Sequence, residues 1–317
     1  MYIVTRCLLL LSFIGLISCS EAPKQPIKLG FNAWPGYEFL YLAEQKGFFE
    51  QVGANIELVQ LSSLSDGQRA YVSGRIDGIA STLVEVVQAT QLSDRPLKVV
   101  LMADYSNGGD VIVANKMIAG MPDLRGKRVG VELGALGLVF LQKALAKYEM
   151  TVDDVEAVNV EQSEGEHALL SGDIAAFVSY PPASLKILRG DNVHQIFSSA
   201  EIPYEIIDVV SVDAAKLEDD AEFVGKLHKV WQMALEYAAK NPEESNALMA
   251  ERQGVSATEF KESLSGVEPI SLHEQAEFLS ANGRLQNSLH EVCEILISME
   301  ALELPCSTLP SMVYTLE

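Results

Sequence analysis

Basic residues are scarce in this 317-residue sequence. The 23 lysines and arginines stand against 44 acidic residues, which gives a formal net charge of −21. A nucleic-acid partner requires a basic face to meet its phosphates, so this balance argues against nucleic-acid binding. The charge does not identify a ligand, because net charge governs solubility and association rather than the chemistry of a site.

Recognisable catalytic motifs are also missing. The sequence has no Gly-x-Ser-x-Gly elbow, no Walker loop and no Gly-x-Gly-x-x-Gly fingerprint. Asn107-Gly108-Gly109 precedes an apolar run rather than a helix, so it is not a phosphate loop. The histidines lack metal-ligand spacing, and they are His167, His194, His228, His273 and His290. We therefore expect no catalytic residue, no cofactor and no metal; a hydrolase with an unrecognised site is the weaker alternative.

The first 18 residues have the composition of a targeting segment. Arg6 is followed by an apolar run from Leu8 to Ile17, which is shorter than the roughly 20 residues that span a bilayer and fits a signal peptide. The run ends in Leu16-Ile17-Ser18-Cys19, which resembles the bacterial lipobox. The resemblance implies cleavage before Cys19, lipid on Cys19, and a tether over 19–26 that anchors the protein in the cell envelope, facing the periplasm. An ordinary signal peptide with an incidental cysteine is the alternative.

Cysteine is rare in the rest of the chain. Cys7 lies in the expected signal peptide, which leaves Cys293 and Cys306 beyond the lipobox. An even pair in an oxidising compartment favours a disulfide, which would contribute up to about 3 kcal/mol by restricting the unfolded chain. Two unpaired thiols are the alternative.

Short apolar runs alternate with helical patterns from residue 27 to residue 210. The runs predict strands at 27–31, 55–61, 78–80, 97–103, 128–131, 155–160 and 174–178. Capping-box spacings, Ser65 with Gln68 and Thr82 with Glu85, predict two helix starts. The repetition predicts an α/β fold with mainly parallel sheets and helices on both faces. From Asp213 onward the patterns are helical alone, and we expect these helices to pack on the first half.

The stretch from Tyr105 to Val113 divides the alternation into two halves. Its two glycines permit a sharp backbone path, and the same order of elements begins again after it. Local sequence repeats too, because Ser73–Ser81 lines up with Ser171–Ser179 at nearly the same offset as Lys28–Phe31 with Arg128–Val131. These features predict two lobes of like architecture. A tight turn inside one sheet, with a common strand-entry turn repeated by chance, is the alternative.

A second crossing is expected at Asp208, in the apolar run Ile206–Val210. Two crossings make a hinge, and a hinge implies a cleft. The resulting division places 27–106 and 210–317 in one lobe and 107–209 in the other.

In open parallel sheets, ligands bind beyond the carboxyl ends of the strands, where helix N-termini point N–H groups outward. The residues expected at these ends are Asn32, Trp34, Tyr37, Ser81, Thr82, Gly109, Asp110, Glu132, Gly134, Ser179, Tyr180 and Asp208. The set combines acids with aromatic rings and lacks lysine and arginine. Sulfonate, nitrate and phosphate sites usually add a cation, whereas acids and rings suit an amine or quaternary nitrogen, with about 0.5–2 kcal/mol for each cation–π contact. We therefore expect a nitrogen-bearing ligand.

Structural roles are the alternative for these residues. Trp34 would pack between helices, Ser81 and Thr82 would cap helices, Asp110 would be a solvated turn residue, and Asp208 would pair inside the hinge.

Several motifs together resemble the nitrate/sulfonate/taurine and thiamine-precursor type of solute-binding protein. They are Phe31-Asn-Ala-Trp-Pro-Gly-Tyr37, Leu42-Ala43-Glu44 with Gly47-Phe48-Phe49, Gly74-x-Ile-Asp-Gly78, Leu124-Arg-Gly-Lys-Arg-Val-Gly130 and Pro203-x-Glu-Ile-Ile-Asp208. The resemblance covers about Ile27 to Ser211 and implies a type II periplasmic-binding-protein fold that docks on an ABC permease, and we expect a monomer. By position, the implied cleft includes Trp34, Ser81, Thr82, Gly109, Asp110, Gly134 and Asp208.

The chain departs from this pattern at Tyr180-Pro181-Pro182, where many relatives read Trp-Glu-Pro. The change loses an acid and leaves the ligand open. One branch of the broader family makes a pyrimidine enzymatically with clustered cysteines, but here no cysteine lies between Cys19 and Cys293. The expected function is a lipid-anchored binding protein for an amine, a taurine-like aminosulfonate or a pyrimidine. A periplasmic ligand sensor that reports to a membrane signalling protein is the alternative.

Overall fold

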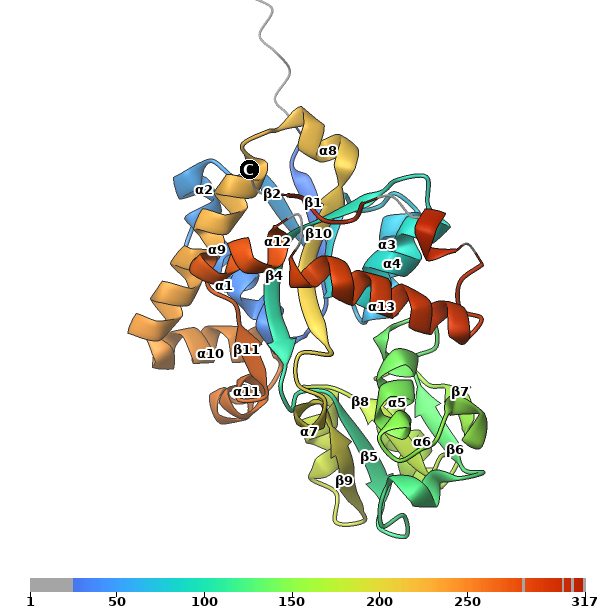
Figure 1. The fold of residues 1–317 in the computed structure, drawn as a ribbon. Coiled ribbons are helices and arrows are strands. Elements are labelled where there is room, and N and C mark those ends of the chain that lie inside the picture. The colour runs from blue at the N-terminus through green and yellow to red at the C-terminus, as the bar shows by residue number, and fades with distance from the viewer. Residues whose placement is uncertain (1–24, 281–282, 304, 309–310, 316–317) are drawn as a thin grey trace, which may run out of the picture.

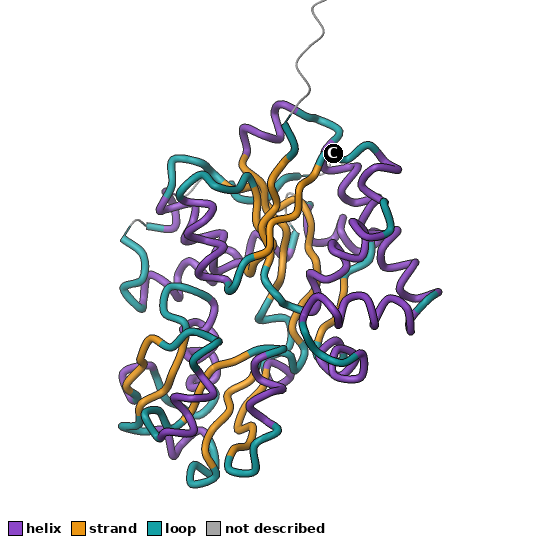
Figure 2. The backbone as a smooth tube through the Cα atoms, turned by 180° about the vertical axis from the view of Figure 1, so that it is seen from behind, coloured by secondary structure: helices purple, strands orange, loops and turns teal. Residues whose placement is uncertain are grey.

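The structure is a computed structural model that describes residues 25–280, 283–303, 305–308 and 311–315. The expected signal peptide over 1–18, Cys19 and most of the expected tether lie outside the described residues. Within these ranges the chain forms two separate sheets covered by helices, seen one above the other in Figure 1 and from behind in Figure 2. None of the described helices is long and apolar enough to cross a membrane.

The first sheet has six strands in the described chain, in the spatial order β11-β4-β10-β3-β1-β2. These strands are β1 (Ile27–Phe31), β2 (Ile56–Gln60), β3 (Gly78–Thr82), β4 (Leu97–Ser106), β10 (Ile207–Asp213) and β11 (Val267–Pro269). The second sheet has five, in the order β7-β6-β8-β5-β9. They are β5 (Val111–Asn115), β6 (Arg128–Val131), β7 (Glu156–Asn159), β8 (Ala176–Ser179) and β9 (Val193–Ser198). We call the first sheet with its helices lobe 1, and the second sheet with its helices lobe 2.

The chain crosses between the sheets twice within the described residues. The first crossing leads from β4, which ends at Ser106, to β5, which begins at Val111. The second leads from β9, which ends at Ser198, back to β10, which begins at Ile207. The division expected after residue 106 coincides with the end of β4, and the division expected after residue 209 falls inside β10.

Both sheets are mixed, which corrects the expectation of mainly parallel sheets. β1 runs parallel to β2 and β3, and β6 runs parallel to β7 and β8. The strands that receive the crossings, β5 and β10, run antiparallel to their neighbours. A crossing delivers the next strand at the end of the sheet that faces the other lobe. That strand must therefore run away from the gap between the lobes, against neighbours that run toward it.

The two sheets share one strand order. The series β4-β10-β3-β1-β2 of lobe 1 corresponds to β9-β5-β8-β6-β7 of lobe 2. The sequence repeats fall on equivalent strands, since Lys28–Phe31 lies in β1 and Arg128–Val131 forms β6. Gly78–Ser81 lies in β3, and Ala176–Ser179 forms β8. The repeats in the sequence therefore mark equivalent places in the two lobes.

The helices between the strands begin close to the expected positions. They are α1 (Glu38–Gln45), α2 (Phe48–Val52), α3 (Leu64–Val72), α4 (Leu83–Leu92), α5 (Leu136–Ala146), α6 (Gly165–Ser171) and α7 (Ala183–Leu188). Short 3-10 turns are η1 (Pro35–Tyr37), η2 (Met121–Leu124), η3 (Val152–Asp154), η4 (Ser199–Glu201) and η5 (Cys306–Thr308). Thr82 and Glu85 form the capping box expected at α4. The start expected at Ser65 is wrong, because the extended residue Ser63 is the N-cap of α3 and accepts from the Asp66 N–H at 3.2 Å.

The chain after β10 covers lobe 1. Its helices are α8 (Ala214–Asp219), α9 (Phe223–Lys240), α10 (Pro242–Gln253), α11 (Ala257–Leu264), α12 (Leu272–Leu279) and α13 (Arg284–Ser298). This region is not helical alone, because β11 lies between α11 and α12 and pairs antiparallel with β4. α9 packs on α1 and α2, as expected, and α13 packs on α4 (Figure 1). α13 also reaches α5 of lobe 2.

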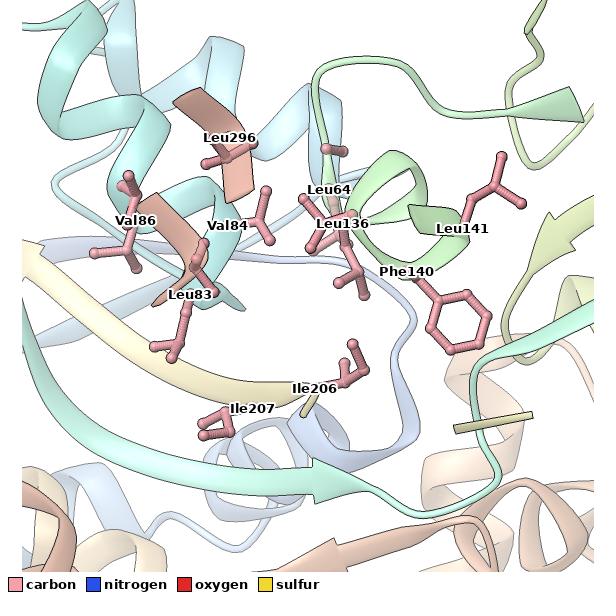
Figure 3. Close-up of a cluster of buried hydrophobic side chains, with 14 of the residues drawn as sticks. Leu64, Leu83, Val84, Val86, Leu136, Phe140, Leu141, Ile206, Ile207 and Leu296 are labelled. Carbon is pink, nitrogen blue, oxygen red and sulfur yellow. The ribbon is translucent and has the colours of Figure 1, made fainter. Parts of the chain in front are cut away.

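One apolar core is continuous from lobe 1 to lobe 2. Leu83 and Val84 of α4 share it with Leu136 and Phe140 of α5 and with Leu296 of α13 (Figure 3). Burial of apolar surface is worth about 25 cal/mol per Å². This shared core therefore stabilises an arrangement in which the two lobes are closed against each other.

A disulfide joins Cys293 of α13 to Cys306, with the two Cα atoms 5.9 Å apart. The bond ties the segment after α13 back to the helix. Of the two states considered from the sequence, the structure has the bridged one.

Candidate functional site

A small cavity lies between the lobes, at the ends of β1, β3 and β8 and at the start of β10. Its lining residues are Asn32, Trp34, Tyr37, Leu64, Thr82, Asp110, Leu136, Tyr180 and Asp208. The space left between their side chains is about 10 Å³, which is room for about one water molecule. The lobes are thus closed on the site, and a larger guest requires them to separate.

Most of the residues expected at the site surround this cavity. Asn32, Trp34, Tyr37, Thr82, Asp110, Tyr180 and Asp208 line it. Glu132 lies behind Tyr180, whose hydroxyl donates to Glu132 Oε2 at 3.2 Å. Gly109 lies against the Trp34 ring, because a Cβ at this glycine would come within 2.5 Å of Trp34 Cη2. The role of these residues in ligand binding stays a prediction.

Besides Gly109 and Glu132, three further expected residues are not among the described lining residues. Ser81 is buried, and its hydroxyl donates to the Thr82 carbonyl at 3.3 Å. Ser179 donates to Gln162 Oε1 at 2.9 Å. Gly134 has a φ of 79° in the turn that leads into α5, a conformation that favours glycine. Ser81 and Gly134 thus act on the backbone around the site, and Ser179 holds a neighbouring side chain.

Two acids stand side by side on neighbouring strands. Asp104 of β4 and Asp208 of β10 are register partners. Trp34 Nε1 donates to Asp104 Oδ1 at 3.0 Å, and the Tyr37 hydroxyl donates to Asp208 Oδ1. Both Oδ2 atoms are buried and receive no hydrogen bond from a donor group of the described chain. A buried acceptor without a donor is costly, so this pair requires a proton or a donor brought by a guest.

Burial raises the pKa of several site acids, because a carboxylate loses hydration inside the protein. The pKa of Asp104 is raised to about 8 and that of Asp110 to about 7, with burial the main cause in both. The pKa of Asp208 is raised well above its usual range, first by burial and then by the charge of Asp104. Burial also raises the pKa of Glu85 to about 7. These carboxyl groups are therefore protonated more readily near neutral pH than exposed acids are.

Glu85 of α4 connects the two lobes. One carboxylate oxygen accepts from the Thr82 N–H at 2.9 Å and from the Thr82 hydroxyl at 2.6 Å. The other accepts from the Leu136 N–H at 2.8 Å. Leu136 is the first residue of α5, whose N-cap residue provides no side-chain cap. Glu85 thus caps a helix of lobe 2 from lobe 1, and this contact requires the lobes to be closed.

Lobe 2 contributes Tyr180 and Glu132 to the site. The Tyr180 hydroxyl accepts from Asn32 Nδ2 at 3.4 Å, and its ring meets the Trp34 ring edge-on at 6.3 Å between centroids. Ser65 Oγ of lobe 1 donates to Glu132 Oε1 at 3.3 Å. Burial raises the pKa of Glu132. These contacts hold lobe 2 over the acids of lobe 1.

Positive side chains are absent from the described lining of the cavity. Arg252 approaches its border, where it donates to the Asn32 carbonyl at 3.1 Å, but its guanidinium is paired with the buried Glu38. No group of His, Cys, Asp or Glu in the described ranges is arranged to hold a metal ion. Acids and aromatic rings without a protein cation suit a positively charged nitrogen.

Four residues of the site were not predicted from the sequence. Asp104 and Glu85 were not expected there, although an acid inside an apolar strand run was a usable signal for Asp104. Glu85 was recognised only as the partner in a capping box. Leu64 and Leu136 are the first residues of α3 and α5, and an apolar residue at a helix start gives no signal of a binding site.

The family model described as NMT1/THI5 like matches residues 34–245. The chain belongs to this family. The matched residues contain both crossings and nearly the whole cavity lining. A Brucella abortus protein named as a binding protein is 24% identical over 309 residues, which cover 93% of this chain and 92% of that protein.

A second relative of the NMT1/THI5-like chain is named as an enzyme. The 4-amino-5-hydroxymethyl-2-methylpyrimidine phosphate synthase of Aspergillus parasiticus is 24% identical over 184 residues. The match covers 58% of this chain and 52% of the synthase, so it spans about half the length of that relative.

Solved structures confirm the two-lobed periplasmic-binding-protein fold. The periplasmic aliphatic sulphonate binding protein SsuA of Escherichia coli matches with a TM-score of 0.73 and 16% identity, over 92% of this chain and 95% of that chain. SsuA of Xanthomonas axonopodis pv. citri, an alkanesulfonate-binding protein bound to MOPS, matches with a TM-score of 0.77 and 16% identity. The match covers 93% of this chain and 100% of that chain. The desulfurization enzyme DSZB also matches, with a TM-score of 0.64 and 17% identity, over 89% of this chain and 94% of that chain. The fold alone therefore does not separate binding from catalysis.

Proposed function

We propose that this chain is the lipid-anchored substrate-binding component of an ABC importer, and that its lobes close around a small polar solute containing nitrogen. The observation that carries the proposal is the cavity between the lobes, where buried acids and aromatic rings converge without a positive side chain among the described lining residues. The solute belongs to the amines, the taurine-like aminosulfonates or the pyrimidines.

The proposal assigns a role to each part of the chain. The two lobes follow the two sheets, so the second boundary comes before β10 rather than after residue 209 as expected, and Asp208 belongs to lobe 1. Lipid on Cys19 holds the protein in the bacterial cell envelope, facing the periplasm. The folded part acts as a monomer and delivers its guest to an ABC permease.

Ligand binding shifts the equilibrium between separated and closed lobes, because the guest contacts both lobes only when they are closed. The contact of Glu85 with the α5 N-terminus is one that separation breaks. Lys143 of α5 also bridges to Glu291 of α13 at 3.1 Å, and Arg189 at the end of α7 pairs with Glu259 of α11. These contacts offset part of the entropic cost of closure.

We favour binding over catalysis for this site. No cysteine lies between Cys19 and Cys293, and histidine, cysteine and lysine are absent from the described cavity lining. The relatives named as binding proteins align over nearly their whole length, whereas the synthase aligns over about half.

Isothermal titration against amines, taurine-like aminosulfonates and pyrimidines tests the proposal. Binding of one class is expected, and no binding by any small solute to the folded protein would contradict it. Asp110→Ala should weaken binding by at least about tenfold, because it removes a buried charge-bearing acceptor from the cavity. Asp173→Ala, at an exposed position of lobe 2, is the control. An unchanged affinity for Asp110→Ala would remove Asp110 from the site.

A further inference from the structure

We propose that the site takes a guest with a full positive charge, and that this guest enters in exchange for protons held by the acids of lobe 1. The inference deepens the proposed function and rests on it, because it takes the cavity between the lobes as the ligand site. It narrows the solute from nitrogen-containing compounds in general to cationic ones.

The titratable groups that face the paired acids Asp104 and Asp208 are acidic from every element around them. They are Tyr37 of η1, Glu85 of α4 and Asp110 of the first crossing. Tyr180 of lobe 2 interacts in turn with Asp110 and donates to Glu132. Arg252, at the border, is already paired with Glu38. Several carboxylates cannot all be ionised in this buried site without a cation, because burying an uncompensated charge is strongly unfavourable. Protons or a positive guest must supply the missing charge.

The positions of Asp104 and Asp208 favour a proton on this pair. The two carboxyl groups belong to register partners on neighbouring strands, and neither Oδ2 atom has a donor from the described chain. Two buried carboxylates on neighbouring strands repel each other, so ionisation of one favours protonation of the other. Burial is the main cause that raises the pKa of both groups, and the charge of Asp104 raises the pKa of Asp208 further. The closed lobes therefore hold at least about one proton at this pair near neutral pH.

An ammonium or other cationic nitrogen replaces this proton in both of its roles. It brings the positive charge that the acids lack, and its N–H groups can donate to the unmatched oxygens. Asp208 is one of the residues that line the cavity, and Asp104 is its partner on the neighbouring strand. Trp34 and Tyr180 are aromatic rings of the lining, and the face of such a ring attracts a cation. A sulfonate or nitrate group would instead place negative charge beside these acids.

A matched pair of probes tests the charge of the guest. Ethanolamine and taurine are both two-carbon amines. Ethanolamine carries a neutral hydroxyl group, whereas taurine carries a negatively charged sulfonate. Calorimetric titration at about pH 7, repeated in phosphate and in Tris, measures the protons released from the difference in apparent heat. We expect ethanolamine to bind with release of about one proton, and taurine to bind at least about tenfold more weakly. The affinity for ethanolamine should fall as the pH drops below about 7, because protons then compete for the acids.

A second measurement does not depend on the choice of probe. Burial raises the pKa of Asp104 to about 8 in the folded protein, from an ordinary value of 3.8. The folded state then binds more protons than the unfolded chain between these values, so stability is lost as the pH rises through this range. The melting temperature of the wild type should fall more steeply between about pH 5 and about pH 8 than that of Asp104→Asn, which has no proton to lose. Equal slopes would overturn the proton-holding role of the pair.

The outcomes separate this inference from the proposed function. If no solute of any charge binds the folded protein, the proposed function fails. If taurine or a neutral solute binds as tightly as ethanolamine, or if a guest binds without releasing protons, the proposed function stands and the inference is wrong. Failure of ethanolamine and choline to bind a protein that does bind a neutral or anionic solute likewise overturns it.

Discussion

The two lobes share a strand order, yet equivalent strand ends carry different chemistry. Asn32 follows β1 where Glu132 follows the equivalent β6, and Thr82 ends β3 where Tyr180 follows β8. The acids of lobe 1 include oxygens without a donor, whereas both oxygens of Glu132 accept hydrogen bonds from nearby side chains. We therefore expect lobe 1 to provide the main polar contacts to a guest, and lobe 2 to close over it. A common scaffold does not require the two halves of a site to contribute equally.

The difference between the lobes is tested most directly at Asp208 of lobe 1. Asp208→Asn keeps the size of the side chain but removes its charge and one acceptor, and we expect binding to weaken by about 100-fold, as a charged hydrogen bond of about 2.7 kcal/mol implies. Titration calorimetry with whichever solute binds the wild type measures the change. Asp66→Asn, which alters a half-exposed acid that pairs with Arg69 on α3, is the control and should leave affinity unchanged.

The corresponding acid of lobe 2 provides the matched test. Glu132→Gln should weaken binding by about tenfold at most, because Glu132 already has partners inside the protein. The same titration decides the point. A larger loss from Glu132→Gln than from Asp208→Asn would reverse the roles given to the two lobes.

Tyr180→Phe tests how much the contacts of Tyr180 contribute to closure of lobe 2 over the site. The substitution keeps the ring against Trp34 but removes the hydroxyl that contacts Glu132 and Asn32. We expect a loss of about threefold in affinity, which corresponds to about 0.7 kcal/mol for one neutral hydrogen-bond network. Faster dissociation with an unchanged association rate, measured by stopped flow, would fit a residue that closes the site. A loss as large as that of Asp208→Asn would mean that Tyr180 holds the guest directly.

The disulfide should have the smallest effect on binding. Replacing both Cys293 and Cys306 with serine removes a cross-link between residues that are 13 positions apart in the sequence. We expect the free energy of unfolding to fall by up to about 3 kcal/mol. Urea denaturation measures this loss. Affinity at a temperature where the variant is folded should match the wild type, because neither cysteine lines the cavity. A marked loss of affinity would show that α13 positions the site through its contact with α5.

Much of the fold and of the cavity lining could be predicted because strand ends are visible in a sequence. Asn32, Tyr180 and Asp110 stand where apolar runs stop or begin, and parallel strands bring such residues to one edge. The direction of β5 and β10 could not be read, since a strand that arrives through a crossing has the same apolar pattern as any other. β11 was missed because three residues that include a proline carry almost no strand signal.

The acid pair shows a different limit. Five strands of the described chain lie between Asp104 on β4 and its register partner on β10, and only the sheet order makes the two residues neighbours. A pairing between distant strands cannot be inferred from periodicity, which reports faces and not partners. The carboxyl oxygens without a donor and the raised pKa values of the two acids depend on that pairing, so they could not be predicted from the sequence.

The most direct test of the account is native mass spectrometry of the wild type and of Asp208→Asn after both have been incubated with the small-molecule filtrate of a bacterial lysate. The account predicts that the wild type retains a nitrogen-containing solute that unfolding releases, and that Asp208→Asn retains much less of it. A retained guest without nitrogen, equal retention by the two proteins, or a folded wild type that retains nothing would contradict the claim that the lobes close on a nitrogen-bearing solute.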